Sequence, residues 1–136
     1  MTSFVTDTSA IIAVLNDEPD ALQFKQAFHE ADSVLVSFAT LFETACVAAS
    51  QRFVDGSKRL EALVDLLDMT PVVFDDTQLR QASDAYALYG RASGHPANLN
   101  MGDCFAYALA KSRNLPLLFK GDDFIHTDIR PALKPA

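Results

Sequence analysis

Three acidic residues each stand alone in a long uncharged stretch of the chain: Asp7 in residues 1–16, Glu43 in residues 33–51 and Asp103 in residues 92–110. Moving a carboxylate out of water costs on the order of several kcal/mol unless a cation or hydrogen-bond donors compensate it, and no Lys or Arg is close in sequence. We therefore expect the fold to gather these carboxylates around Mg²⁺ or Mn²⁺, divalent cations that prefer oxygen ligands. The alternative for each acid is a helix cap or a distant Arg partner.

Short apolar runs alternate with helical patterns along the chain. The runs predict strands at residues 3–6, 34–36, 70–74 and 115–119, with a short last strand beginning at Ile129. Apolar residues at helical spacing predict helices at residues 8–15, 19–31, 38–53, 57–67, 77–91 and 104–111. Strands this short and apolar are typical of a parallel sheet buried on both faces. The sequence therefore predicts a three-layer α/β fold, in which helices cover both faces of a mostly parallel sheet of four to five strands, and a single domain over residues 1–136.

The isolated acids should meet at one edge of that sheet. In open parallel sheets, functional sites lie beyond the carboxyl ends of the strands. Asp7 follows the first predicted strand, and Asp122 and Asp123 follow the fourth. Asp103 lies in the first turn of the preceding helix and reaches this edge only if that helix begins there. Carboxylates that hold two cations about 3.5–4 Å apart could support cleavage of a phosphodiester.

Four segments carry a resemblance to a known family. They are Asp7-Thr8-Ser9-Ala10, the 37–47 helix that contains Glu43, Leu99–Ala108 and Pro116–Phe124. Together they resemble the PIN-domain ribonuclease toxins of the VapC type over nearly the whole chain. The most specific part is the Asn-x-Gly-Asp-Cys-Phe helix, which is followed at the family's spacing by Leu-Phe-Lys-Gly-x-Asp-Phe.

The resemblance implies an endoribonuclease that depends on Mg²⁺, with Mn²⁺ as an alternative, and that cuts RNA. It also implies inhibition by a cognate antitoxin of the VapB type and dimers that pair into larger complexes with it. The metal ligands would be Asp7, Asp103 and Glu43. A fourth catalytic acid is usual in the family, and here the Gly-x-Asp-Phe pattern favours Asp123.

Other residues near these motifs remain candidates. Asp122 and Asp128 are alternatives for the fourth acid. Thr8 and Ser9 could hydrogen-bond the first carboxylate or a phosphate, although as capping hydroxyls they also have a structural reason to be there. Lys120 is either a contact to substrate phosphate or a solvated lysine at the end of a strand.

Apolar residues on the predicted helices indicate where the helices pack and where a partner could dock. The main apolar face of the 38–53 helix comprises Phe38, Leu41, Phe42, Ala45, Cys46 and Ala49. Cys46 is expected to be a reduced core residue. An antitoxin peptide could dock on a second set, and its Arg or Lys would reach the acids. That set is Phe24, Phe28, Phe53 and Leu60.

Composition limits the other functions of the chain. A net charge of −7 argues against recognition of nucleic acid through a basic patch, although a bound cation would reverse the local field. The sequence has no run of 18 apolar residues and no signal-peptide pattern, so we expect a cytoplasmic protein that does not enter a membrane.

Three rival functions place different demands on the positions of the acids. A phosphoacceptor receiver domain would use Asp7, Asp75 and Lys120, but it needs a second acid where Thr6 stands. A haloacid-dehalogenase-like phosphatase needs Asp-x-Asp, which Asp7-Thr8-Ser9 lacks. A non-catalytic PIN-like binding module would have little reason to keep all the acids.

Overall fold

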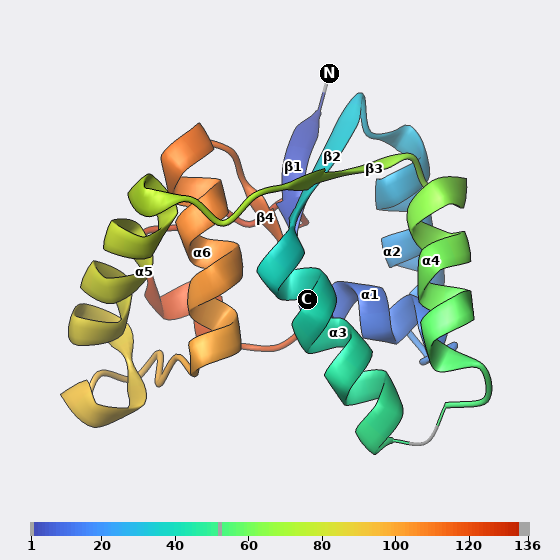
Figure 1. The fold of residues 1–136 in the computed structure, drawn as a ribbon. Coiled ribbons are helices and arrows are strands. Elements are labelled where there is room, and N and C mark those ends of the chain that lie inside the picture. Colours follow the sequence, from blue (N-terminus) through green and yellow to red (C-terminus); the bar gives the residue numbers. More distant parts are fainter. Residues whose placement is uncertain (1, 52, 134–136) are drawn as a thin grey trace.

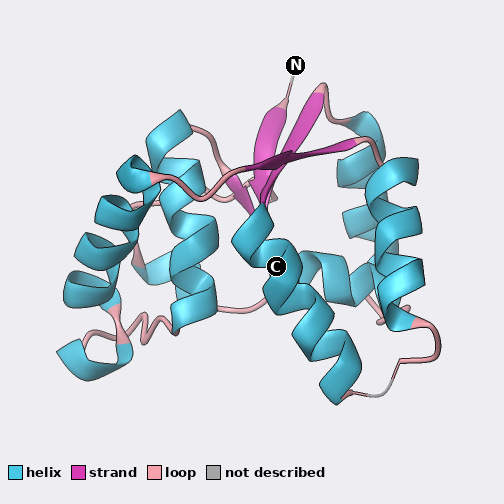
Figure 2. Ribbon diagram, in the orientation of Figure 1, coloured by secondary structure: helices cyan, strands magenta, loops and turns pink. Residues whose placement is uncertain are grey.

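The computed structural model describes residues 2–51 and 53–133, and in these residues a four-stranded parallel sheet lies at the centre (Figure 2). The strands are β1 (Ser3–Thr6), β2 (Ser33–Ser37), β3 (Met69–Val72) and β4 (Leu117–Leu118), in the order β3-β2-β1-β4. All three pairings are parallel. The expected strand from Ile129 is wrong, because the segment after it makes only an isolated bridge between Pro131 and Leu117.

Helices cover both faces of the sheet, as the three-layer α/β prediction requires. They are α1 (Thr8–Leu15), α2 (Ala21–Glu30), α3 (Phe38–Ser50), α4 (Gly56–Leu66), α5 (Asp76–Tyr89) and α6 (Met101–Arg113), with 3-10 turns η1 (Arg91–Ser93) and η2 (Asp123–His126). Figure 1 shows α5 and α6 on one side of the sheet, α2 and α4 on the other, and α3 between the two groups. None of the described helices is long and apolar enough to cross a membrane.

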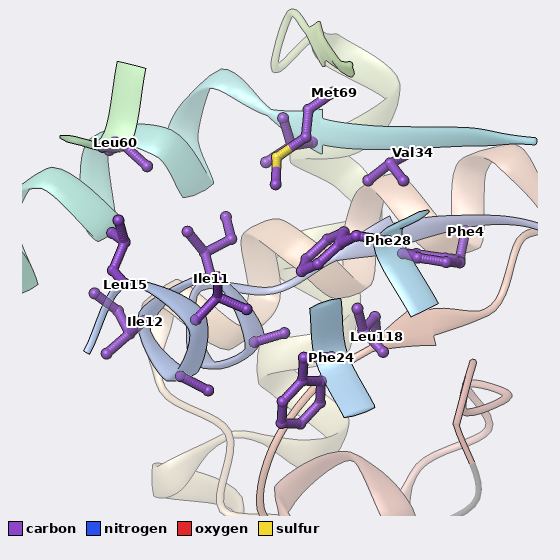
Figure 3. Packing of buried hydrophobic residues seen from close by; sticks show 14 residues of the cluster. Phe4, Ile11, Ile12, Leu15, Phe24, Phe28, Val34, Leu60, Met69 and Leu118 are labelled. Carbon is purple, nitrogen blue, oxygen red and sulfur yellow. The ribbon is translucent and has the colours of Figure 1, made fainter. Parts of the chain in front are cut away.

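Successive strand residues contribute alternately to two separate hydrophobic cores, one on each face of the sheet. Phe4 and Leu118 point into the core under α1, α2 and α4, which Figure 3 shows. Their neighbours Val5 and Leu117 point into the core beneath α5 and α6. Each of these four side chains is at most 3% exposed, as the period of two in a strand requires when both faces are covered.

The chain places several helix N-termini at one edge of the sheet. Asp7 follows β1 and caps α1, Ser37 ends β2 and caps α3, and Asp75 caps α5 just after β3. Helix α6 leads into β4, which runs parallel to the other strands, so α6 must run the opposite way and begin at the same carboxyl edge. The condition for Asp103 to join the other acids is therefore met.

Part of the predicted apolar face of α3 points away from the core, whereas its Leu41 and Ala45 pack against the core. Phe38 is 52% exposed and Phe42 is 72% exposed, and Cys46 is exposed too, so the expectation of a core cysteine is wrong. The buried side of the helix carries Thr40, Thr44 and Ala48 instead. Small side chains let α3 approach its neighbours closely, and Thr44 Oγ1 hydrogen-bonds with Thr8 Oγ1 and with the Thr40 carbonyl. The buried Thr40 Oγ1 has no partner among the described residues.

The apolar set that was expected to receive the antitoxin belongs mostly to the core. Phe24, Phe28 and Leu60 are at most 6% exposed and pack in the cluster of Figure 3, while Phe53 is partly buried against it. These residues were predicted on two helices that could pair with an apolar peptide, but the core itself occupies them, as the contact of Phe4 with Phe28 shows.

Candidate active site

Asp7 combines a helix cap with an unused carboxylate oxygen. It lies directly after β1 and is 4% exposed. Its Oδ2 accepts hydrogen bonds from the Ser9 backbone N at 3.1 Å and from Ser9 Oγ at 2.7 Å. Its Oδ1 is buried and has no hydrogen-bond partner. A buried carboxylate oxygen without a donor is costly, and a bound cation would compensate it.

Asp103 is held by a reciprocal cap at the start of α6. The Asn100 backbone N donates to Asp103 Oδ2 at 3.0 Å, and the Asp103 backbone N donates to Asn100 Oδ1 at 2.8 Å. This capping box fixes the carboxylate in the first helical turn, where it is 8% exposed. The Asn-Met-Gly-Asp pattern was a visible signal for the cap, and the sequence analysis did not use it.

Glu43 approaches the other acids from α3. Thr8 Oγ1 donates to Glu43 Oε1 at 2.6 Å, and the same hydroxyl lies 3.0 Å from Thr44 Oγ1. Thr44 in turn donates to the Thr40 carbonyl at 2.8 Å. The sequence analysis missed Thr40 and Thr44, although their four-residue spacing on the side of Glu43 marked them as a polar pair in an apolar helix.

The acids repel one another and are poorly solvated. Burial, with repulsion from Glu43, raises the pKa of Asp7 from 3.8 to about 6. Burial and then repulsion from Asp7, with smaller contributions from Asp123 and Glu43, raise the pKa of Asp103 from 3.8 to about 7. Burial also raises the pKa of Glu43. The environment of Asp7, Glu43 and Asp103 therefore favours protonation or a bound cation.

The three candidates for the fourth acid differ in their surroundings. The charge of Asp123 is among the main causes of the raised pKa of Asp103, whereas those of Asp122 and Asp128 are not. Asp128 accepts hydrogen bonds from Tyr107 Oη and Lys111 Nζ, each at 2.6 Å. Burial alone would raise the pKa of Asp128, but these hydrogen bonds outweigh it and lower the pKa. Asp128 is thus already compensated by the protein.

The remaining candidates act as supports. Ser9 Oγ donates to Asp7 and accepts from the Lys120 backbone N at 2.9 Å. The Lys120 ammonium pairs with Glu18 at 2.5 Å and Asp20 at 3.1 Å, which ties the end of β4 to the segment between α1 and α2. The lysine is therefore neither fully solvated nor free to contact a phosphate without leaving these acids.

The donor set suits a hard divalent cation. No Lys or Arg in the described ranges forms an ion pair with Asp7, Glu43 or Asp103. In the same ranges no three His, Cys, Asp or Glu side chains are already gathered in coordinating positions. The caps explain why these acids are not already gathered, because Asp7 and Asp103 each engage one oxygen with a helix N-terminus. The partnerless Asp7 Oδ1 and the oxygen ligands together fit Mg²⁺ or Mn²⁺.

Comparison with known proteins agrees with this geometry. The PIN domain family matches residues 4–130. Ribonuclease VapC28 of Mycobacterium tuberculosis is 46% identical over 129 residues, which cover 95% of this chain and 97% of that protein. Ribonuclease VapC42 of the same species is 41% identical over 128 residues, covering 94% and 98%.

Solved structures share the fold at lower identity. Mycobacterium tuberculosis VapC20, described as a Sarcin-Ricin loop cleaving toxin, has a TM-score of 0.72 and 16% identity, covering 94% of this chain and 99% of that one. The VapBC-5 structure from the same species has a TM-score of 0.63 and 24% identity, covering 98% and 97%. The match along nearly the whole chain excludes the receiver-domain and phosphatase alternatives. The chain belongs to the PIN-domain family, and within it to the VapC ribonuclease toxins of toxin–antitoxin systems.

Proposed function

We propose that the protein is an endoribonuclease that hydrolyses RNA phosphodiester bonds with Mg²⁺, or Mn²⁺ in its place, held by Asp7, Glu43, Asp103 and Asp123. The observation that carries this proposal is the buried Asp7 Oδ1, which has no hydrogen-bond partner among the described residues and belongs to a group of mutually repelling carboxylates. A site kept this way at a cost in stability is expected to have a functional reason.

The protein's own groups orient the ligands. Ser9 fixes Asp7 through two hydrogen bonds, Asn100 fixes Asp103 through its backbone N, and Thr8 fixes Glu43 through its hydroxyl. A bound cation would supply Lewis-acid activation of the attacking water and stabilise charge on the leaving oxygen. These hydrogen bonds orient each carboxylate separately, and a bound cation would still have to draw the acids together, because no three of them in the described ranges are gathered in coordinating positions.

Asp123 differs from the other three acids in its exposure. It lies exposed in the 3-10 turn after β4, whereas Asp7 and Asp103 are buried. An exposed carboxylate near the buried ones can move to meet a cation and its water ligands as RNA binds. Because Asp122 and Asp128 are exposed too, the choice rests on the charge of Asp123, which contributes to the raised pKa of Asp103, and we assign Asp123 as the fourth acid.

The expected protein partner is a cognate antitoxin of the VapB type. Similar structures include a toxin-antitoxin complex from Klebsiella pneumoniae and VapBC2 from Rickettsia felis bound to a promoter DNA fragment. In this chain an open groove between α2 and α4 could receive an apolar helix. Its lining is Val14, Lys25, Gln26, His29, Glu30, Leu63, Leu66 and Leu67, of which Leu66 is 79% exposed.

A second copy of the chain is the expected partner for α3. Phe38, Phe42 and Cys46 recur every four residues on its exposed side, and this spacing forms one apolar stripe. Homodimers should form through this stripe and assemble with the antitoxin into a larger complex. Substituting Phe42→Asp should shift the purified protein from dimer to monomer in light scattering, whereas Leu22→Asp on α2 should not.

The decisive experiment uses protein freed of antitoxin and a structured RNA. Cleavage should occur with Mg²⁺ or Mn²⁺, stop with EDTA, and fall at least about a hundredfold in Asp7→Asn and Asp103→Asn. Asp76→Asn is the matched control, because Asp76 is exposed and forms an ion pair with Arg80. Cleavage that persists in EDTA would refute a metal-dependent mechanism. Antitoxin binding without any cleavage would favour a non-catalytic binding module.

A further inference from the structure

The carboxylate of Glu43 lies where a side chain of residue 102 would be. Gly102 occupies the second position of α6, next to Asp103. A Cβ atom built on Gly102 would overlap Oε2 and Cδ of Glu43 and lie 2.6 Å from Oε1. Glu43 of α3 can therefore lie this close to α6 only because residue 102 is a glycine and has no side chain.

Backbone conformation does not explain this glycine. Gly94 and Gly121 have φ values of +78° and +101°, and a Cβ atom at either position would meet nothing within 4 Å, so their conformation alone favours glycine. Gly102 has ordinary helical geometry, and glycine is among the poorest residues for a helix. The only feature at Gly102 that requires glycine is the space that Glu43 fills.

We propose that Gly102 is a positioning residue that seats the Glu43 carboxylate beside Asp103. The proposal rests on the proposed function in one respect, that Glu43 is a metal ligand. The N-terminus of α6 favours a carboxylate at this place through its helix dipole, and Thr8 holds the other oxygen of Glu43. A side chain at residue 102 would displace the end of Glu43, because that flexible group moves more easily than the helix.

A double-mutant cycle tests whether Gly102 positions the Glu43 carboxylate, with Mn²⁺ alone as the probe. Gly102→Ala, Glu43→Ala and the double variant are compared by calorimetric titration of Mn²⁺ and by melting in EDTA. Gly102→Ala and Glu43→Ala should each weaken Mn²⁺ binding by about 10- to 100-fold, and the double variant should be no weaker than Glu43→Ala. The matched control is Met101→Ala, one residue earlier and 70% exposed, which should bind Mn²⁺ like the parent.

Melting in EDTA examines the same contact without metal. With Glu43 removed, Gly102→Ala should raise the melting temperature, because alanine is the better helix former. With Glu43 present, the rise should be smaller or reversed, since the added methyl group must displace the carboxylate.

The outcomes separate the two hypotheses. Parent protein that binds no Mn²⁺ would refute the metal site, while the melting cycle would still decide whether Gly102 seats Glu43. Unchanged Mn²⁺ affinity in Gly102→Ala would overturn the inference with the metal site intact. Losses that multiply in the double variant would also overturn it, because Gly102 would then act independently of Glu43.

Discussion

Asp7 and Asp103 each use one carboxylate oxygen to cap a helix and leave the rest of the group to the site. Asp7 Oδ2 accepts from Ser9, and Asp103 Oδ2 accepts from the Asn100 backbone N. The caps supply part of the hydrogen bonding that a buried charge needs, and they hold each acid in a fixed orientation. Capping and metal binding are therefore compatible at the same residue, and the cap positions the group for the second role.

Neutralising either acid should not harm the metal-free fold. Asn caps a helix as well as Asp does, and it removes a charge that burial and its neighbours disfavour. We expect Asp7→Asn and Asp103→Asn to melt in EDTA at the parent's temperature or above it, by up to about 2 kcal/mol in free energy of unfolding. Both should lose most of the Mg²⁺-induced rise in melting temperature.

The comparison variant is Asp75→Asn, whose side chain caps α5 by accepting from the Gln78 backbone N at 2.9 Å. It should keep the full Mg²⁺-induced rise. If Asp103→Asn unfolded several degrees earlier than the parent in EDTA, its carboxylate would be a satisfied structural group and the metal site would lie elsewhere.

The raised pKa values predict how stability depends on pH without metal. Asp103 and Asp7 titrate with pKa values of about 7 and about 6 in the folded protein, against 3.8 for an ordinary Asp. Between these values the folded state binds more protons than the unfolded state, so the free energy of unfolding should fall as pH rises from about 4 to about 7. Denaturant unfolding in EDTA across this range measures the slope.

The same slope should be shallower in Asp103→Asn, because one of the acids with a raised pKa is gone. Saturating Mg²⁺ should flatten it in the parent, since a bound cation keeps both acids ionised. A parent whose metal-free stability rises across this window would contradict the assignment of these acids as uncompensated.

At the scale of helices and strands, the sequence predicted the order of the elements and, within a few residues, where most of them begin and end. Asp7 and Asp75 are strong capping residues placed directly after short apolar runs, so both strand ends and helix starts were visible. The position of Asp7 at the carboxyl edge of the sheet followed from the parallel topology, because every strand ends at that edge. The start of α6 at that edge needed only the direction of β4.

The orientation of α3 could not be predicted in the same way. Periodicity identifies an apolar face but not whether the core or another protein chain covers it. Here Phe38 and Phe42 are exposed, while Thr40 and Thr44 are buried, and Thr44 satisfies its hydroxyl with Thr8 and a carbonyl. The polar side of α3 faces inward because it contacts Thr8, which is far away in sequence, and a local sequence pattern carries no information on such a contact.

The two capping residues Asn100 and Asp75 provide a test at the level of the helix. Each side chain accepts a backbone hydrogen bond at its helix start, at 2.8 Å in α6 and 2.9 Å in α5. We expect Asn100→Ala and Asp75→Ala to cost a similar amount, roughly 1 kcal/mol, in free energy of unfolding. Only Asn100→Ala should also weaken Mn²⁺ binding, because only α6 carries a site acid in its first turn.

Both quantities can be measured on the same preparations, by denaturant unfolding in EDTA and by Mn²⁺ titration. Equal loss of Mn²⁺ affinity in the two variants would show that general destabilisation, rather than the orientation of Asp103, weakens the site.

At the scale of the whole molecule, RNA must approach an acidic protein. The chain has 11 Lys and Arg against 18 Asp and Glu, and several of its cations are already paired with acids of the protein. Lys120, which lies in the last of the site motifs, is held by Glu18 and Asp20. The excess of acidic side chains opposes the approach of phosphates, and in the proposed mechanism bound cations would supply part of the attraction at the site.

This charge balance predicts a weak dependence of RNA cleavage on salt. A protein that neutralises six to ten phosphates loses about 10³- to 10⁵-fold in affinity between about 50 and 200 mM salt, because counterions are released when it binds. We expect KM for RNA in this protein, measured at constant free Mg²⁺, to change by less than about tenfold over that range. Salt also screens the repulsion between the acidic surface and the RNA, which further offsets the loss. A thousandfold rise in KM would mean that a basic surface absent from the single chain forms on dimerisation or RNA binding.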